Sequence, residues 1–375
     1  MVRFIQTSDW QIGMKGGGLG EAGQIVRDIR VESIHNVFKT AQERKVDFVL
    51  LCGDIFEHNM ISQEYVKKVV TIFNQYPDIS IYLLPGNHDI LGADCVYNRE
   101  IFQRVEHLTI LRADSVEVPE AILHPCPVLS KFTTQDLTAS IPIVRETDGI
   151  HIAVAHGSLV GKFPMSNWED IELPINPSCI DRTGIDYLAL GHWHSKRLFK
   201  DSTGIARIAY SGTHEQTNYD EGDAGQCLFV QIDGKGEVPK IESIKTGKLS
   251  WETKQFEMKD SSSLNELKNY FESIKGIDLV KLALCGELPL ECKEELDNIL
   301  EFQTTLHKNF REKTESLTIT VPPQLETSFD FGDPTLIQTE KHLKNLLENE
   351  ADSEKRIIII EALAHLQRFG KEVEK

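Results

Sequence analysis

Five short polar stretches of this chain are rich in Asp, Asn and His, the side chains that bind divalent metal ions. They are residues 9–11 (DWQ), 53–57 (GDIFE), 86–89 (GNHD), 156–157 (HG) and 191–194 (GHWH). Two divalent ions about 3.5–4 Å apart can neutralise the oxygens of a phosphoester and supply a hydroxide at neutral pH. The residue types therefore indicate a two-metal site for phosphoester hydrolysis.

Asp54 is the candidate bridge between the two ions, because a carboxylate can give one oxygen to each. The remaining ligands would be Asp9 and His194 for one ion, and Asn87, His156 and His192 for the other. Alternate residues of an extended segment point to opposite sides, so His192 and His194 can reach different ions. Such mixed ligands suit Mn, Fe or Zn better than Ca.

Three further residues complete the predicted site. His88 is close enough in sequence to Asn87 to protonate the leaving oxygen or stabilise the transition state, with Asp89 as its orienting partner. Gln11 stands where such a site would use a histidine, and an amide oxygen is a weaker donor to Mn than an imidazole nitrogen. Three hypotheses stay open: an active enzyme with the Gln11 oxygen or a water as ligand, an enzyme that needs high metal, and a degenerate site kept for its architecture.

The elements that must position these residues are short apolar runs, each of which ends just before a polar stretch. They are residues 4–5, 48–51, 79–84, 150–155 and 187–190, and they are typical of buried strands. Apolar residues at helical spacing lie between the first two runs and between the next two. This order predicts an α/β fold with the ligands gathered at the carboxyl ends of the strands. Strands at 205–210 and 227–232 lack a helix between them, which predicts a second, more antiparallel sheet packed against the first.

Beyond residue 250 the pattern predicts a smaller α+β unit. A polar cluster ends at Ser263, which with Glu266 forms a predicted capping box. The predicted elements are a helix (264–275), a strand (278–286), a helix (291–308) and a strand (316–322). Asp333-Pro334 then supplies a helix N-cap and a proline at the first helical position. The two amphipathic helices that follow could pack on the body of the protein or bind a coiled-coil partner.

Composition limits the classes of partner and compartment. The formal net charge of −18 argues against holding nucleic acid by bulk electrostatics, so a nucleic-acid substrate would need a local basic groove or a basic partner. The candidate phosphate contacts are Lys15, Arg27, Arg30, Arg99 and Arg104, which could equally be solvated. Seven scattered cysteines without a CxxC spacing predict free thiols in the cytoplasm. No secretion signal or membrane span is expected.

Taken together, the five stretches resemble the calcineurin-like metallophosphoesterases. Their flanking sequences are similar to those of the SbcD-type DNA repair nucleases, the nuclease subunits of SbcCD-like complexes, over residues 1–235. Residues 280–289 resemble that family's capping domain. The resemblance implies a four-layer α/β/β/α metallophosphoesterase sandwich (1–250), an α+β capping domain (251–325), and a linker with C-terminal helices for an ATPase partner (326–375).

The resemblance also implies an activity. The protein would be a two-metal DNA exonuclease and endonuclease that uses Mn, with Mg, Fe or Zn possible. It would form a homodimer and work with an SMC-like coiled-coil ATPase in DNA repair or foreign-DNA defence. Two other functions stay open: a phosphoesterase for a small nucleotide or phosphoprotein, and a non-catalytic scaffold for the ATPase. The chain departs from the family at Gln11, where the family has histidine, and at His214, which could contact substrate or line a loop.

Overall fold

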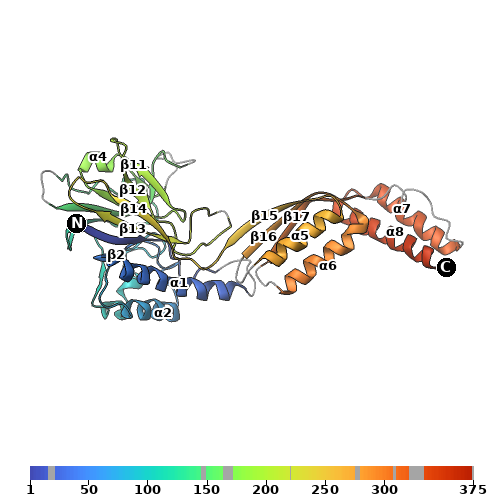
Figure 1. The fold of residues 1–375 in the computed structure, drawn as a ribbon, viewed down its shortest axis with the longest axis horizontal. Helices are drawn as coiled ribbons and strands as arrows, with labels where there is room; N and C mark the ends of the chain where they lie inside the picture. The colour runs from blue at the N-terminus through green and yellow to red at the C-terminus, as the bar shows by residue number, and fades with distance from the viewer. Residues whose placement is uncertain are drawn as a thin grey trace. The chain divides into compact units, whose positions relative to one another are not determined.

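The computed structural model describes residues 1–15, 22–144, 149–163, 172–219, 221–274, 279–306, 310–320 and 333–373. These residues form two compact units, 1–251 and 252–375 (Figure 1). The domain boundaries at 250 and 325 that the sequence suggests stay predictions. Among the described residues, no helix combines the length and the apolar character that crossing a membrane requires.

The first unit is built on two six-stranded sheets. The first sheet has the order β14 (Lys240–Lys245), β13 (Gln226–Ile232), β1 (Val2–Thr7), β2 (Phe48–Cys52), β3 (Ser80–Leu84) and β4 (Leu108–Ile110). The second has the order β11 (Arg197–Lys200), β12 (Ala206–Tyr210), β10 (Tyr187–Gly191), β7 (Ile150–His156), β6 (Ala121–Cys126) and β5 (Val116–Val118). A separate two-stranded sheet pairs β8 (Ser158–Leu159) with β9 (Pro174–Ile175).

A second sheet is present, but the prediction that it contains both later strands and is more antiparallel is wrong. Of the two strands, β12 belongs to it, whereas β13 pairs antiparallel with β1 in the first sheet. The four central strands of the second sheet, β12, β10, β7 and β6, are parallel, and only the edge strands β11 and β5 pair antiparallel. The five predicted strands are therefore divided between two sheets: β1, β2 and β3 lie in the first, and β7 and β10 in the second. The metal-site loops thus come from both sheets.

The two sheets pack face to face through an apolar layer. Phe4 of the first sheet stacks on Phe48 at 5.2 Å between ring centroids, and it meets Tyr187 of the second sheet edge-on at 5.8 Å. Gln6 is fully buried in this layer. Its amide donates to the carbonyls of Leu190 (3.1 Å) and Ala209 (2.8 Å) and accepts from the Tyr187 hydroxyl (2.7 Å). This saturated buried amide fixes the sheets against each other, because each of its bonds would be costly to lose.

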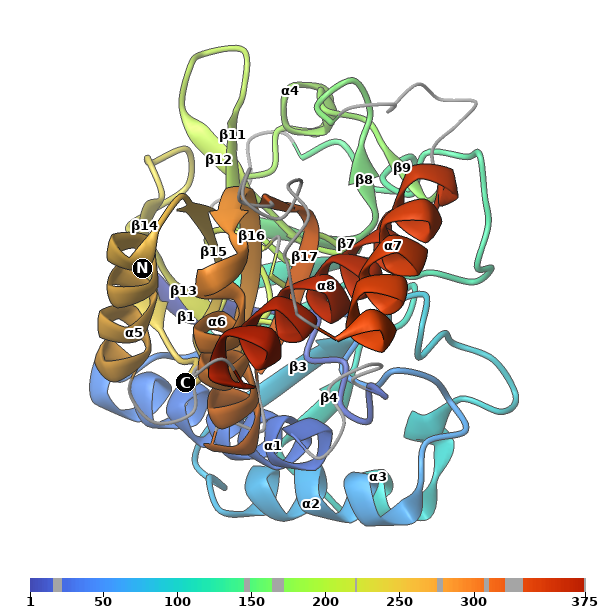
Figure 2. The ribbon, with the colours of Figure 1, turned by 90° about the vertical axis from the view of Figure 1, so that its right-hand side faces the viewer.

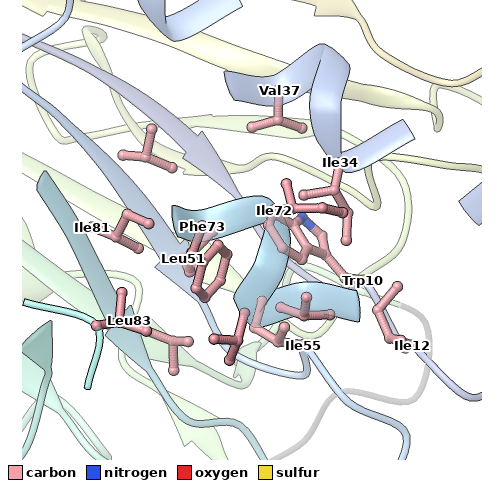
Figure 3. Close-up of a cluster of buried hydrophobic side chains, with 14 of the residues drawn as sticks. Trp10, Ile12, Ile34, Val37, Leu51, Ile55, Ile72, Phe73, Ile81 and Leu83 are labelled. Carbon is pink, nitrogen blue, oxygen red and sulfur yellow. The ribbon is translucent and has the colours of Figure 1, made fainter. Parts of the chain in front are cut away.

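Helices cover the outer face of the first sheet. They are α1 (Ala22–Arg44), α2 (Gln63–Asn74) and α3 (Glu100–Gln103), preceded by the short helix η1 (Val96–Asn98). Leu51 and Phe73 lie in the core beneath them, and Trp10 packs in the same cluster (Figure 3). The outer face of the second sheet packs against α4 (Cys179–Thr183) and loops. The predicted sandwich is thus confirmed.

The second unit contains a three-stranded sheet and four helices. The strands are β15 (Trp251–Met258), β16 (Leu279–Pro289) and β17 (Phe310–Thr320), and the first two helices are α5 (Ser261–Ser273) and α6 (Leu290–Leu306). The predicted helix–strand–helix–strand order is confirmed. The helix cap differs, because Asp260 rather than Ser263 is the N-cap: its carboxylate accepts from the Ser262 and Ser263 amides, and the Ser263 hydroxyl forms the return bond.

The last two helices, α7 (Pro334–Asn349) and α8 (Ser353–Val373), run side by side (Figure 2). Asp333 accepts from the Thr335 amide at 2.6 Å, which confirms the predicted cap. Leu343, Leu347 and Leu363 join the apolar core of the second unit. Four apolar side chains of the pair stay exposed: Ile337, Leu346, Ile358 and Phe369. The predicted linker falls largely on residues outside the described ranges.

Candidate metal centre

The loops that follow β1 and β2 are bound to each other through their backbones. The Asp9 amide donates to the Gly53 carbonyl at 3.0 Å, and the Gln11 amide donates to the Asp54 carbonyl at 2.9 Å. Asp9, Gln11 and Asp54 all have positive φ angles, 54°, 42° and 54°, and so does His192 at 105°. Residues other than glycine rarely adopt this conformation, and such strain concentrates at functional sites.

Two glycines allow these loops to approach one another. Gly53 has φ +92°, and a Cβ there would lie 2.2 Å from the Nδ1 of His156. At Gly191 a Cβ would lie 1.9 Å from the carbonyl oxygen of Cys52. Any side chain would therefore push the loops of the two sheets apart.

Asp9, Asp54 and His156 form a group of possible metal ligands, with their ligand atoms all within 4.8 Å of one another. All three side chains are buried, and the Asp54 Oδ2 lies 3.1 Å from the His156 Nε2. The other ring nitrogen of His156 donates to the Cys52 carbonyl at 2.8 Å. This bond fixes the tautomer that leaves Nε2 free to bind a metal.

Asn87 and His192 extend this group on one side. The Asn87 Oδ1 lies 3.0 Å from the His156 Nε2 and 3.3 Å from the His192 Nδ1. The backbone amide of His192 donates to both carboxylate oxygens of Asp9 at 3.1 Å. Asp54, Asn87, His156 and His192 therefore offer one set of converging donors.

Gln11 and His194 are the two remaining candidate ligands, and they contact each other. The Gln11 Nε2 lies 3.0 Å from the His194 Nε2. The opposite ring nitrogen of His194, Nδ1, is bound by Glu221 Oε1 at 2.6 Å and lies 3.0 Å from the Thr217 hydroxyl. Sequence reasoning missed Glu221, because an acidic residue 27 positions away in a loop carries no local sign that it pairs with a histidine.

The electrostatics of the buried cluster suit a divalent cation. Burial alone would raise the pKa of Asp54, but the neighbouring His156 lowers it to about 2. Burial alone would lower the pKa of His156, but Asp54 raises it to about 9. Without metal the pair is thus a carboxylate and an imidazolium, and a bound cation would replace the imidazolium proton. Burial lowers the pKa of His192 to about 3, so this imidazole is neutral and ready to act as a ligand.

His88 lies against the cluster, but its partner is not the predicted one. The His88 backbone amide donates to the Asp54 Oδ1 at 2.9 Å, and its Nδ1 bonds to the Glu57 carbonyl at 2.8 Å. The carboxylate of Asp89 is fully buried and bonds elsewhere. Its donors are the amides of Gly86 (2.7 Å), Ile55 (2.8 Å) and Phe56 (3.2 Å) and the hydroxyl of Tyr97. The expectation that Asp89 orients His88 is therefore corrected: Glu57 does so, and Asp89 joins two loops.

Arg30 is neither a phosphate contact nor a solvated side chain, because it is fully buried. Its guanidinium donates to the carbonyls of Trp10 (2.7 Å), Asp9 (3.2 Å), Glu215 (2.6 Å) and Gln216 (3.2 Å) and to the Thr213 hydroxyl (2.8 Å). It thus joins the Asp9 loop to the loop after β12. His214 is buried in the latter loop, with its Nε2 2.8 Å from the Arg30 carbonyl, and lines the loop rather than a substrate surface.

The other basic candidates serve local contacts. Arg99 donates to the carbonyls of Ile61 (2.9 Å) and Asn59 (2.7 Å), and so braces the loop that contains Glu57. Arg27 donates to the Lys15 carbonyl and to the Gln24 side chain, and Arg104 pairs with Glu100 on the surface. None of these contacts assigns a phosphate-binding role.

Comparison with known proteins agrees with this geometry. Residues 2–196 match the family model of the calcineurin-like phosphoesterases. The uncharacterised metallophosphoesterase YhaO of Bacillus subtilis is 25% identical over 303 residues, which cover 74% of this chain and 70% of YhaO. The DNA double-strand break repair protein Mre11 of Aeropyrum pernix is 25% identical over 264 residues, covering 65% of this chain and 61% of that protein.

Solved structures give a more distant likeness. A dimetal phosphatase from Danio rerio aligns with a TM-score of 0.40 and 11% identity, over 65% of this chain and 99% of that one. The family model alone spans more than half of the 375 residues and includes all five polar stretches. The chain therefore belongs to the calcineurin-like phosphoesterase family, whose members are hydrolases that act on phosphoesters with divalent metal ions.

Proposed function

We propose that this protein is a metal-dependent DNA nuclease that hydrolyses phosphodiester bonds at a centre with two divalent ions. The observation that carries the proposal is the buried group of Asp9, Asp54 and His156, whose ligand atoms all lie within 4.8 Å of one another, with Asn87 3.0 Å from His156. Among the relatives, the archaeal Mre11 proteins support DNA as the substrate. One of them, from Sulfurisphaera tokodaii, is 21% identical over 82% of its own length.

The residues that would hold the ions follow from the two donor sets. One ion would lie between Asp9, Gln11, Asp54 and His194, and the other between Asp54, Asn87, His156 and His192. When bound, two such ions neutralise charge on the phosphoryl oxygens and lower the pKa of a water molecule. We favour Mn, with Mg, Fe or Zn as alternatives, because imidazole and oxygen donors are mixed.

His88 is the residue we assign to the leaving oxygen. Its backbone bond to Asp54 and its Nδ1 bond to Glu57 fix the imidazole beside the donor sets. Among the described residues, the His88 Nε2 makes no hydrogen bond that would occupy it. Because Nδ1 keeps its proton on the Glu57 carbonyl, Nε2 can give a proton to the leaving oxygen from the imidazolium form, and the same cation can stabilise the developing charge.

The charge of the chain bears on how DNA would be held. With a net charge of −18, binding of duplex DNA by the chain alone should be weak and steeply salt-dependent. We therefore include in the proposal an SMC-like coiled-coil ATPase partner that supplies much of the affinity for DNA. The proposal also includes a homodimer in the cytoplasm. The exposed Ile337, Leu346, Ile358 and Phe369 of α7 and α8 support a partner surface in residues 326–375.

The test is a Mn²⁺ titration of cleavage on linear and hairpin DNA with the wild type, His88→Ala and a control, His365→Ala. His365 is an exposed histidine of α8, so its variant controls for the loss of any imidazole. The proposal predicts that the wild type and the control cleave DNA and that His88→Ala does not.

Two results would replace the proposal. Hydrolysis of a bis-aryl phosphodiester without any cleavage of DNA would indicate a phosphoesterase for a small nucleotide or phosphoprotein. No hydrolysis of either substrate at any metal concentration would indicate a scaffold for the ATPase.

A further inference from the structure

The two donor sets differ in their chemistry. We define the Asp9 position as the ligands assigned to the first ion, Asp9, Gln11, Asp54 and His194, which would offer one imidazole among oxygen donors; of these, Asp9 and Asp54 have ligand atoms within 4.8 Å of each other, and Gln11 contacts His194. The Asn87 position consists of Asp54, Asn87, His156 and His192 and offers two imidazoles. Oxygen donors suit hard cations such as Mg²⁺ and Mn²⁺, whereas imidazole suits Zn²⁺ and Fe²⁺. Gln11 is the residue that creates the difference in imidazole number, because a histidine there would give each position two imidazoles.

Gln11 also competes for the metal-facing nitrogen of its own position. Its amide nitrogen lies 3.0 Å from the His194 Nε2, while Glu221 holds the His194 Nδ1 at 2.6 Å. The Nδ1 proton therefore points to Glu221, and Nε2 accepts from the Gln11 amide. To bind a cation, the Gln11 amide must rotate by about 180°, so that its oxygen takes the place of its nitrogen. The hydrogen bond from the Gln11 Nε2 to the His194 Nε2 is then lost. Filling the Asp9 position thus requires an amide rotation and the loss of this hydrogen bond.

The Asn87 position needs no amide rotation, although a cation there must displace a proton from His156. The His156 Nδ1 donates to the Cys52 carbonyl, so its Nε2 already faces the Asn87 and Asp54 oxygens at 3.0 and 3.1 Å. The Asn87 Oδ1 also lies 3.3 Å from the His192 Nδ1. These donors converge without a rotation of any amide.

We propose that the two positions select different cations, the Asp9 position binding Mg²⁺ or Mn²⁺ weakly and exchangeably and the Asn87 position retaining a transition metal. The inference rests on the two-metal centre of the proposed function, and not on DNA as the substrate. It makes Gln11 the residue that determines metal selectivity in this chain.

The experiment measures metal content rather than activity. Metal-free protein is loaded with Mn²⁺, dialysed against excess Mg²⁺, and the retained Mn²⁺ is counted by mass spectrometry and by electron paramagnetic resonance. The variants are Gln11→His, Glu221→Gln and the control Gln103→His, which adds an imidazole at an exposed position of α3. Unchanged thermal unfolding of the metal-free variants shows that each has folded.

The wild type and Gln103→His should each keep one Mn²⁺ per chain after dialysis, and Gln11→His should keep two. Glu221→Gln should weaken Mn²⁺ binding at the exchangeable position by roughly 10–100-fold and leave the retained ion in place. Equal retention in the wild type and Gln11→His would overturn the inference. Binding of one ion at most, at any concentration, would reject the two-metal centre as well. If the exchange occurs as predicted but no DNA is cleaved, the metal selectivity stands and the nuclease proposal falls.

Discussion

Replacing Arg30 with methionine removes the donor that joins two loops of the metal centre. Arg30 is fully buried, and its guanidinium makes five hydrogen bonds to the Asp9 loop and to residues 213–216. Burial lowers the pKa of Arg30 to about 10, so the side chain stays charged at neutral pH. Methionine has a similar length but no donor, and it leaves buried carbonyls without partners.

The size of the effect follows from these bonds. A buried acceptor that loses its partner costs about 1–3 kcal/mol, and hydrogen bonds to charged groups are at the upper end of the range. Allowing for relaxation of the weaker bonds, we expect a loss of about 5 kcal/mol in the free energy of unfolding. In a unit of 251 residues this loss lowers the melting temperature by about 10–20 °C.

Scanning calorimetry of the metal-free protein measures this loss. The matched control is Arg104→Met, because Arg104 makes an exposed pair with Glu100 that is worth about 0.5 kcal/mol at most. Arg30→Lys keeps the charge and up to three donors, so its melting temperature should lie between those of wild type and Arg30→Met. If Arg30→Met melted as the Arg104 control does, the buried guanidinium would not stabilise these loops, and the reasoning would be refuted.

Three other predictions concern catalysis, acid stability and metal. Arg99→Ala should lower the kcat of phosphodiester hydrolysis about tenfold at unchanged KM, because Arg99 braces the loop that orients His88, and Arg99→Lys should recover part of it. Burial lowers the pKa of His124 to about 4, so its contribution to the free energy of unfolding is full above about pH 6.5 and falls by up to about 3 kcal/mol as the pH drops to 4. Urea unfolding of His124→Phe should show a smaller pH dependence, because burial also lowers the pKa of the neighbouring His151. Mn²⁺ at about 100 times its Kd should raise the melting temperature by about 5–10 °C, and Asp54→Asn should abolish most of this rise.

The sequence predicted the parts of the site that depend on local order. Short apolar runs end where the polar stretches begin, and the carboxyl ends of β1, β2, β7 and β10 carry these stretches into one cluster. The structure brings Asp54 together with Asp9 and His156, and its role as the residue shared by two ions stays a prediction. The cap at Asp333 was predictable for the same reason, since it depends on the next three residues only.

The parts that could not be predicted depend on partners far away in the chain. Arg30 bonds to residues 183 to 186 positions away, and nothing in helix α1 distinguishes it from a solvated arginine. Asp89 lies beside a candidate catalytic histidine, yet its carboxylate bonds to amides 33 and 34 positions earlier. The placement of β12 and β13 was missed because consecutive strands without a helix between them suggest neighbours in one sheet, whereas β12 pairs parallel with β10 and β13 pairs antiparallel with β1 in the other sheet.

The most direct test of the two-metal centre is anomalous X-ray diffraction from crystals grown with saturating Mn²⁺. The structure predicts two anomalous peaks about 3.5–4 Å apart on either side of the Asp54 carboxylate, one beside Gln11 and the other beside Asn87. A single peak at saturation, or peaks that do not share Asp54, would contradict the account.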